Sequence, residues 1–164
     1  MPIQQIHVEN FKSFSELDID LAQFNVVIGS NAAGKSNFIS IFRFLHDIAT
    51  AGIVNAIAMQ GGADYLRNAK IGTARDLVVR VRYIPERTLE FVENKGEGPA
   101  LLGMRACESQ YEFALRFTGH QDDFIIVRDR LEIGCEISAC RYNGATVEED
   151  SPIGKGRVAI ASED

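Results

Sequence analysis

The sequence predicts an α/β fold in which a helix packs on a mixed sheet and a mainly antiparallel β lobe follows. Three observations predict it: a short apolar run at 24–28, a helical stripe of apolar residues soon after it, and alternation of apolar and polar residues after residue 76. With 164 residues, 46% of them hydrophobic, the chain is long enough to bury one substantial core. We therefore expect a core domain at residues 1–60 and an antiparallel lobe at residues 61–164.

The first thirty residues are predicted to form strands. Ile3, Ile6 and Val8 begin an extended segment, and residues 17–21 alternate between apolar and acidic side chains, which indicates a strand with one solvated face. The run Phe-Asn-Val-Val-Ile at 24–28 is short, largely apolar and rich in β-branched residues. Such a run favours a strand covered on both faces, in the middle of an α/β sheet.

A helix is predicted directly after the glycine-rich segment at 29–36. From Phe38 to Ala49 the apolar residues recur three or four positions apart, which is typical of a buried helix face. Gly52 is predicted to end this helix, and a second short helix is expected over residues 54–59.

Strands are predicted again from residue 77 onward. Apolar and charged residues alternate over 77–83, 111–117 and 131–137, which indicates antiparallel strands with one solvated face. The pair Asn143-Gly144 is typical of a hairpin turn. Residues 85–108 contain two prolines and three glycines, and this stretch is predicted to be a loop.

The motif with the clearest chemistry is Gly29-x4-Gly34-Lys35-Ser36, a complete phosphate-binding loop pattern between a predicted strand and a predicted helix. Phosphate oxygens are bound by backbone N–H groups that converge on one point, and glycine lets the backbone approach the anion without a Cβ. The start of the helix would add its unpaired N–H groups. Lys35 would bridge the β- and γ-phosphates as the candidate catalytic residue, and Ser36 would ligate Mg²⁺.

The residues around this loop resemble the N-terminal half of ABC-type ATPase heads. The segment 6–14 (Ile-His-Val-Glu-Asn-Phe-Lys-Ser-Phe) and the segment 25–38 are similar to those of the SMC, RecF, AAA_21-like and OLD-type (overcoming lysogenisation defect) proteins. Ala32 stands where SMC proteins usually carry glycine, so the spelling is more similar to the AAA_21 and OLD-type branch. The resemblance implies a protein that uses ATP and Mg²⁺ in DNA repair, chromosome maintenance or phage defence. A cytoplasmic location is expected on separate grounds, because no signal-peptide pattern follows Met1 and no apolar run is long enough for a membrane span.

The resemblance also implies roles for single residues. Lys12 matches a motif that lies near the nucleotide in several relatives, although a solvated lysine at a strand end is an equal alternative. The candidate ATP-binding residues are therefore Gly29, Ser30, Asn31, Ala32, Ala33, Gly34, Lys35, Ser36, Asn37 and Lys12, with Ser36 as the metal ligand.

Two motifs that complete an ABC-type head are absent from this sequence. There is no signature motif and no Walker B strand, because the nearest match, residues 124–129, has Arg before its Asp and no Glu after it. We interpret residues 124–129 as an ordinary strand. The C-terminal half of the same ATPase, or a second head in a homodimer, is expected to supply what is missing, and this part alone is expected to hydrolyse ATP slowly or not at all.

Composition excludes some functions and leaves others open. The net charge of −6 excludes a wholly basic nucleic-acid module, no apolar run is long enough for a membrane span, and three cysteines without paired spacing indicate no zinc cage. A small-molecule kinase stays as a further alternative. A nucleotide-gated interaction or DNA-binding module is another alternative. In that case a stripe of arginines on the predicted strands would contact the DNA backbone: Arg80, Arg82, Arg116, Arg128 and Arg130. The competing interpretation is that these arginines pair with Glu112 and Glu132 on neighbouring strands.

Overall fold

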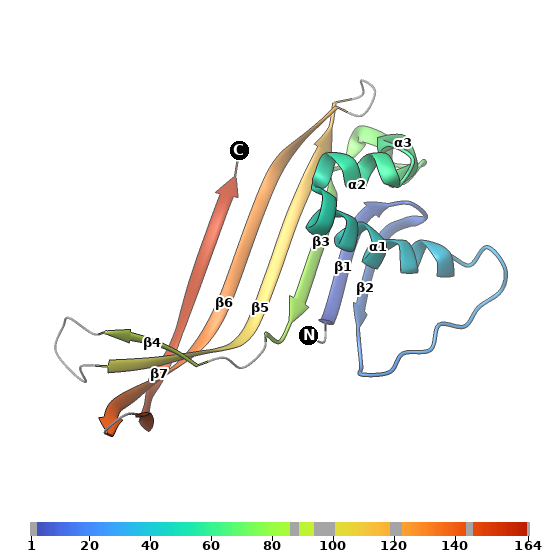
Figure 1. Cartoon of the computed structure of the whole chain (residues 1–164). Coiled ribbons are helices and arrows are strands. Elements are labelled where there is room, and N and C mark those ends of the chain that lie inside the picture. Colours follow the sequence, from blue (N-terminus) through green and yellow to red (C-terminus); the bar gives the residue numbers. More distant parts are fainter. Residues whose placement is uncertain (1–2, 86–88, 94–100, 119–122, 144–145, 164) are drawn as a thin grey trace.

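One antiparallel sheet organises the molecule in this computed structural model, which describes residues 3–85, 89–93, 101–118, 123–143 and 146–163. Its strands follow the order β2-β1-β3-β5-β6-β7, and β4 pairs with the beginning of β5 (Figure 1). The strands are β1 (Ile3–Phe11), β2 (Phe14–Asp20), β3 (Leu77–Tyr83), β4 (Leu89–Glu93), β5 (Leu101–Phe117), β6 (Phe124–Asn143) and β7 (Thr146–Glu163).

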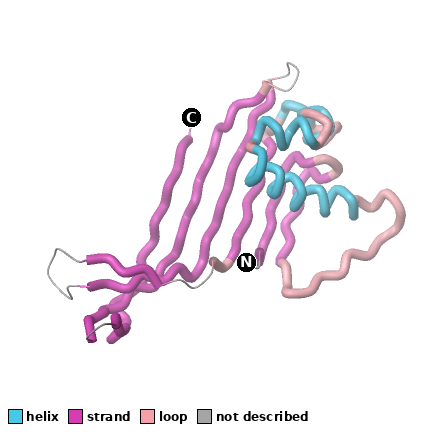
Figure 2. The backbone as a smooth tube through the Cα atoms, viewed as in Figure 1, coloured by secondary structure: helices cyan, strands magenta, loops and turns pink. Residues whose placement is uncertain are grey.

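The predicted mixed sheet is wrong, because all pairings among the described strands are antiparallel. The segment 24–28, predicted to be a buried strand, lies in the long loop between β2 and the first helix (Figure 2). Phe24 is 82% exposed and Ile28 is 87% exposed. A strand inside a sheet needs hydrogen-bonding neighbours, and no described strand pairs with this segment, so its apolar composition alone does not bury it.

The helices lie together on one face of the sheet, and they are α1 (Lys35–Ala51), α2 (Ile53–Met59) and α3 (Ala63–Leu66), followed by the short 3₁₀ turn η1 (Gly72–Ala74) (Figure 1). The ring of Phe44 on α1 packs between Phe11 of β1 and Phe113 of β5, at centroid distances of 6.0 and 6.3 Å. Both predicted helices are confirmed. Gly52, with a φ of +80°, ends α1 and donates its N–H to the Ile48 carbonyl at 3.0 Å.

The prediction of a loop over residues 85–108 is wrong for its described parts, which form β4 and the first half of β5. Glycines and mixed charges hide the alternation there, and the strands are stabilised by partners distant in sequence, since Leu102 pairs with both Val92 and Ala139. As a result β5, β6 and β7 extend well beyond the helices (Figure 2). The predicted hairpin joins β6 to β7 through the pair Asn143–Thr146, and Gly144 lies outside the described residues.

Candidate phosphate-binding site

The loop that precedes α1 makes a sharp turn into the helix. Ala32 and Gly34 both adopt left-handed backbone conformations, with φ of +64° and +90°, and the Ala33 N–H donates to the Ser30 carbonyl at 3.3 Å. The positive φ of Gly34 favours glycine at this position, and a Cβ there would make a tight contact of 3.2 Å with Ser13 Oγ. The helix then begins at Lys35, where its first N–H groups have no partners within the helix.

Lys35 folds back over this loop. Its ammonium Nζ donates to the carbonyls of Gly29 and Ser30 at 2.7 and 2.6 Å, which holds the charge beside the loop backbone. The N-terminal end of a 17-residue helix adds a partial positive charge at the same place. Ser36 follows in the first turn with its side chain exposed. The residues predicted to bind phosphate therefore gather where positive charge is concentrated.

The β1–β2 turn is tied to this helix start by a contact that the sequence did not reveal. The side-chain amide of Asn37 donates to Ser13 Oγ at 2.8 Å, so Asn37, a predicted nucleotide contact, here contacts the turn. The Phe14 ring also lies near Gly34, within 3.4 Å of the position a Cβ would take. No local spacing rule connects residues 24 positions apart, although Ser13 belongs to the segment that carries the family resemblance.

Lys12 lies in the same turn, next to Ser13. Its backbone has a φ of +48° and its N–H donates to the Leu66 carbonyl at 2.8 Å. Burial lowers the pKa of Lys12, and the nearby Arg43 guanidinium lowers it further. A half-buried cation beside a second cation favours an anionic neighbour, but Arg43 itself could not be predicted, because it lies two helical turns beyond the motif.

Comparison with known proteins agrees with this geometry. The family model of the AAA ATPase domain matches residues 1–130, which is most of the chain. The chain belongs to this family. A stretch of 47 residues is 40% identical to the endonuclease GajA of Bacillus cereus strain VD045. That match covers 29% of this chain but only 8% of the endonuclease, so the chain spans a small part of that relative's length.

An apolar cleft of about 380 Å³ opens beside the loop of this ATPase domain. It lies between β2, the loop residues 26–28 and the start of α1, where Phe38 and Lys35 form one wall. The exposed side chains of Val26 and Ile28 line it, so the face that the sequence predicted to be buried borders the phosphate loop.

Among the described residues, no group of three or more His, Cys, Asp or Glu side chains is arranged to hold a metal ion. Asp129, the acidic residue of the nearest Walker B match, lies in β6, which confirms that residues 124–129 are an ordinary strand. Burial raises the pKa of Tyr111 to about 12, and hydrogen bonding to Asp129 adds to this rise, so this carboxylate is engaged by the sheet.

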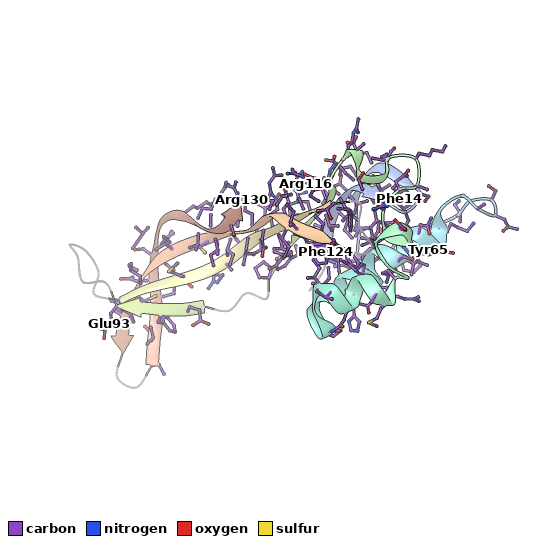
Figure 3. All side chains as sticks on the ribbon, turned by 90° about the horizontal axis from the view of Figure 1, so that it is seen from above. Phe14, Tyr65, Glu93, Arg116, Phe124 and Arg130 are labelled. Carbon is purple, nitrogen blue, oxygen red and sulfur yellow. The ribbon has the colours of Figure 1, made fainter. Side chains whose placement is uncertain are left out.

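Arg116 and Arg130 lie on the face of the sheet away from the helices, as Figure 3 shows. The five arginines considered as a DNA-binding stripe all pair with carboxylates: Arg80 and Arg128 with Glu112, Arg82 with Glu108 and Asp20, Arg116 with Asp76, and Arg130 with Glu132. The alternative of pairing with Glu112 and Glu132 is confirmed for Arg80, Arg128 and Arg130, whereas Arg82 and Arg116 pair with other carboxylates.

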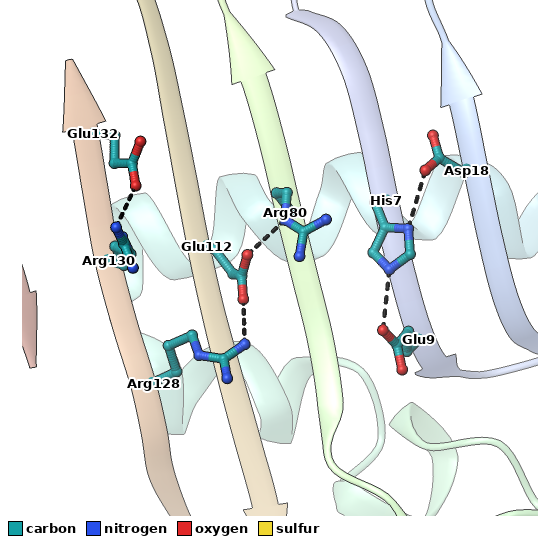
Figure 4. A network of polar contacts seen from close by, with 8 residues as sticks. All are labelled: His7, Glu9, Asp18, Arg80, Glu112, Arg128, Arg130 and Glu132. Atoms are coloured by element: carbon teal, nitrogen blue, oxygen red, sulfur yellow. Dashed lines mark hydrogen bonds and ion pairs between the residues drawn. The ribbon is translucent and has the colours of Figure 1, made fainter. Parts of the chain in front are cut away.

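Glu112 is the buried centre of this network, because it accepts hydrogen bonds from both Arg80 and Arg128 at 2.5 Å (Figure 4). Its side chain is only 8% exposed. Burial by itself would raise the pKa of Glu112, but the two guanidinium groups outweigh it and hold the pKa below its usual range.

This lowered pKa predicts a pH dependence of stability. A carboxyl whose folded-state pKa lies below its unfolded value of about 4.3 stabilises the fold above that pH and loses this contribution as the pH falls through the folded-state pKa. Glu112→Gln should lower the free energy of unfolding at pH 7 by about 1–3 kcal/mol and should flatten its decline below about pH 4.3. Urea unfolding across the pH range checks this, with exposed Glu16→Gln as control, and an equal acid decline in wild type and Glu112→Gln would contradict it.

No helix among the described residues is long and apolar enough to cross a membrane.

Proposed function

We propose that this domain binds ATP with Mg²⁺ through residues 29–36, as the Walker A half of an ABC-type ATPase. The observation that carries the proposal is the position of Lys35, whose ammonium is held 2.7 and 2.6 Å from two carbonyls of a loop with a left-handed Gly34. Membership of the AAA ATPase domain family supports the choice of nucleotide.

The residues present fit the phosphates of such a ligand. The loop offers backbone N–H groups at a helix start, and Lys35 would exchange its two carbonyl partners for phosphate oxygens. The Ser36 hydroxyl would hold Mg²⁺ together with the phosphates and water, since Mg²⁺ is commonly bound by few protein ligands. The bound Mg²⁺ would neutralise phosphate charge. Lys12, in the turn that Asn37 contacts through Ser13, would approach the same anion.

We further propose that hydrolysis needs polypeptide beyond these 164 residues. Residues 124–129 do not form a Walker B site, and the apolar segment 24–28 with its cleft is exposed beside the loop. The C-terminal half of the same ATPase would cover that segment and supply the acidic residues, and a second head would supply the signature motif. Residues 1–60 then form the nucleotide-binding core and residues 61–164 the β lobe of one head.

The biological setting is proposed from resemblance. The sequence of the motif is similar to that of the SMC, RecF, AAA_21 and OLD-type proteins. The short match to an endonuclease supports a role in a protein that processes nucleic acid. DNA repair, chromosome maintenance and phage defence are such settings. A kinase is disfavoured because the described sheet is antiparallel, and the pairing of the arginines removes the main support for a DNA-binding stripe.

Calorimetric titration with ATP and Mg²⁺, followed by a phosphate-release assay, tests the proposal. The 164-residue chain should bind ATP without steady turnover, and adding the completing part of the ATPase should produce turnover. Steady turnover by the chain alone would contradict the proposed division of the active site, and absence of ATP binding would contradict the proposed site itself.

Asn31 offers a graded test of how the loop binds phosphate. Asn31→Ala should weaken ATP binding by only about threefold to tenfold, because a backbone N–H at this position still reaches the anion. The same calorimetric titration measures the change. A loss as large as that caused by removing Lys35 would mean that the Asn31 side chain is itself an essential contact.

A further inference from the structure

The strand β7 forms one edge of the sheet, and its outer side is open. It pairs with β6 along almost its whole length, and no described strand pairs with its other side (Figure 1). Strand edges of this kind present unpaired N–H and C=O groups, which another strand can satisfy. The C-terminal part of β7, residues 155–162, is regular in register with β6.

The side chains of this edge are divided cleanly between the two faces of the sheet. Val158 pairs with Ile133 and Ile160 with Leu131, and Leu131 pairs in turn with Tyr111, so all five lie on the face that carries the helices. Val158 is 45% exposed and Ile160 is 66% exposed. The apolar stripe of the sheet therefore reaches the open edge and ends there uncovered.

The usual protections of an edge strand are missing over residues 158–162 of β7. Natural edges carry prolines, bulges or charges that point inward from the apolar face. Residues 158–162 read Val-Ala-Ile-Ala-Ser, without charge or proline, and their pairing with β6 continues without a bulge. Ala159 and Ala161 are the small residues on the opposite face. Nothing in this segment hinders the approach of another strand.

We propose that β7 pairs with β7 of a second copy of this chain, antiparallel and centred on Ala159. A two-fold axis perpendicular to the sheet places the helices of both copies on the same side of the combined sheet. Side chains alternate between the two faces of a strand, so even-numbered residues of one copy must then pair with even-numbered residues of the other. Centring on Ala159 places Val158 opposite Ile160 of the other copy, and Ile160 opposite Val158. Both β-branched pairs are then formed, which centring on either neighbour would not achieve.

The charges of the edge agree with this register. Arg157 lies on the polar face, where it pairs with Glu132 at 3.3 Å, and in the dimer it would stand opposite Ala161. Arg157 of one copy is then four residue positions away from Arg157 of the other copy along the paired strands, so these two like charges do not stand opposite each other. Because the apolar residues of the segment match one another and its arginines do not oppose each other, a second copy fits it as an isologous partner.

Sedimentation velocity of the nucleotide-free chain tests the pairing independently of ATP binding. The strand pair is small, so we expect a reversible dimer with a dissociation constant on the order of 10–100 µM. Ile160→Lys should weaken dimerisation by at least about tenfold, because it places a charge in the apolar stripe. Ile39→Lys is the matched control, since Ile39 is 57% exposed on α1, and it should leave the dimer unchanged.

Disulfide trapping tests the register. In a Cys107→Ser background, which leaves only the buried Cys135 and Cys140, Ala159→Cys should cross-link to itself on oxidation. Opposed residues of antiparallel strands have Cα atoms about 4.5–5.5 Å apart, within disulfide reach. Arg157→Cys should not cross-link, because its two copies would be about 13 Å apart. A monomer at all concentrations, a dimer insensitive to Ile160→Lys, or cross-linking at 157 in place of 159 would overturn the proposal.

Discussion

We expect Lys35→Ala to lower the affinity of this domain for ATP at least about a hundredfold and to leave the fold intact. The expected loss corresponds to at least two charge-assisted hydrogen bonds to phosphate. The fold should survive because the ammonium contacts the exposed carbonyls of Gly29 and Ser30 and lies outside the apolar core.

Calorimetric titration with ATP and Mg²⁺ measures this loss, and circular dichroism with thermal unfolding checks the fold. Lys70→Ala is the matched control, since Lys70 is exposed and lies outside the loop, and it removes the same charge. Affinity unchanged in Lys35→Ala would refute the phosphate-binding assignment. A loss of the same size in Lys70→Ala would show that general electrostatic attraction is responsible.

Phe44→Ala is expected to have the largest effect on stability, a decrease of about 3–5 kcal/mol in the free energy of unfolding. Phe44 is fully buried, and its ring packs against Phe11 and Phe113, so it joins the helix of the phosphate loop to two strands of the sheet. Removal of the Phe44 ring would leave a cavity that the surrounding strands are too rigid to fill.

Urea unfolding followed by circular dichroism measures this change. Phe24→Ala makes the same substitution at a side chain that is 82% exposed, and it should alter the free energy of unfolding by less than about 0.5 kcal/mol. Equal effects of the two substitutions would mean that residues 24–28 are buried in the 164-residue chain, contrary to the structure described above.

Several features of the fold could be predicted from the sequence because their causes are local. The hydrogen bonds of a helix join residues four positions apart, so the apolar stripe and Gly52 were enough to predict α1 and its end. The phosphate loop is also local, since Gly34 and Lys35 are set by the turn and the helix start themselves. Alternation predicted the solvated and buried faces of β3.

Other features depend on partners that are distant in sequence. The segment 24–28 has the composition of a buried strand, but burial needs neighbouring strands, and among the described residues none pairs with it. Residues 101–108 read as a loop, yet β4 and β6 pair with them on both sides. The family resemblance singled out the segment 6–14 without predicting its turn, and only the structure connects Ser13 with Asn37.

The sequence by itself therefore predicted the helix that follows residues 29–36 and an ATPase domain, because the motifs that indicate them are short runs of residues. That residues 29–36 bind phosphate stays a prediction. Only the tertiary structure decided that the sheet is antiparallel, that Glu112 pairs with two arginines, and that β7 leaves an apolar edge open. Strand order and side-chain pairing are set by contacts between distant segments, and a pattern along one segment carries no information about which segment will lie beside it.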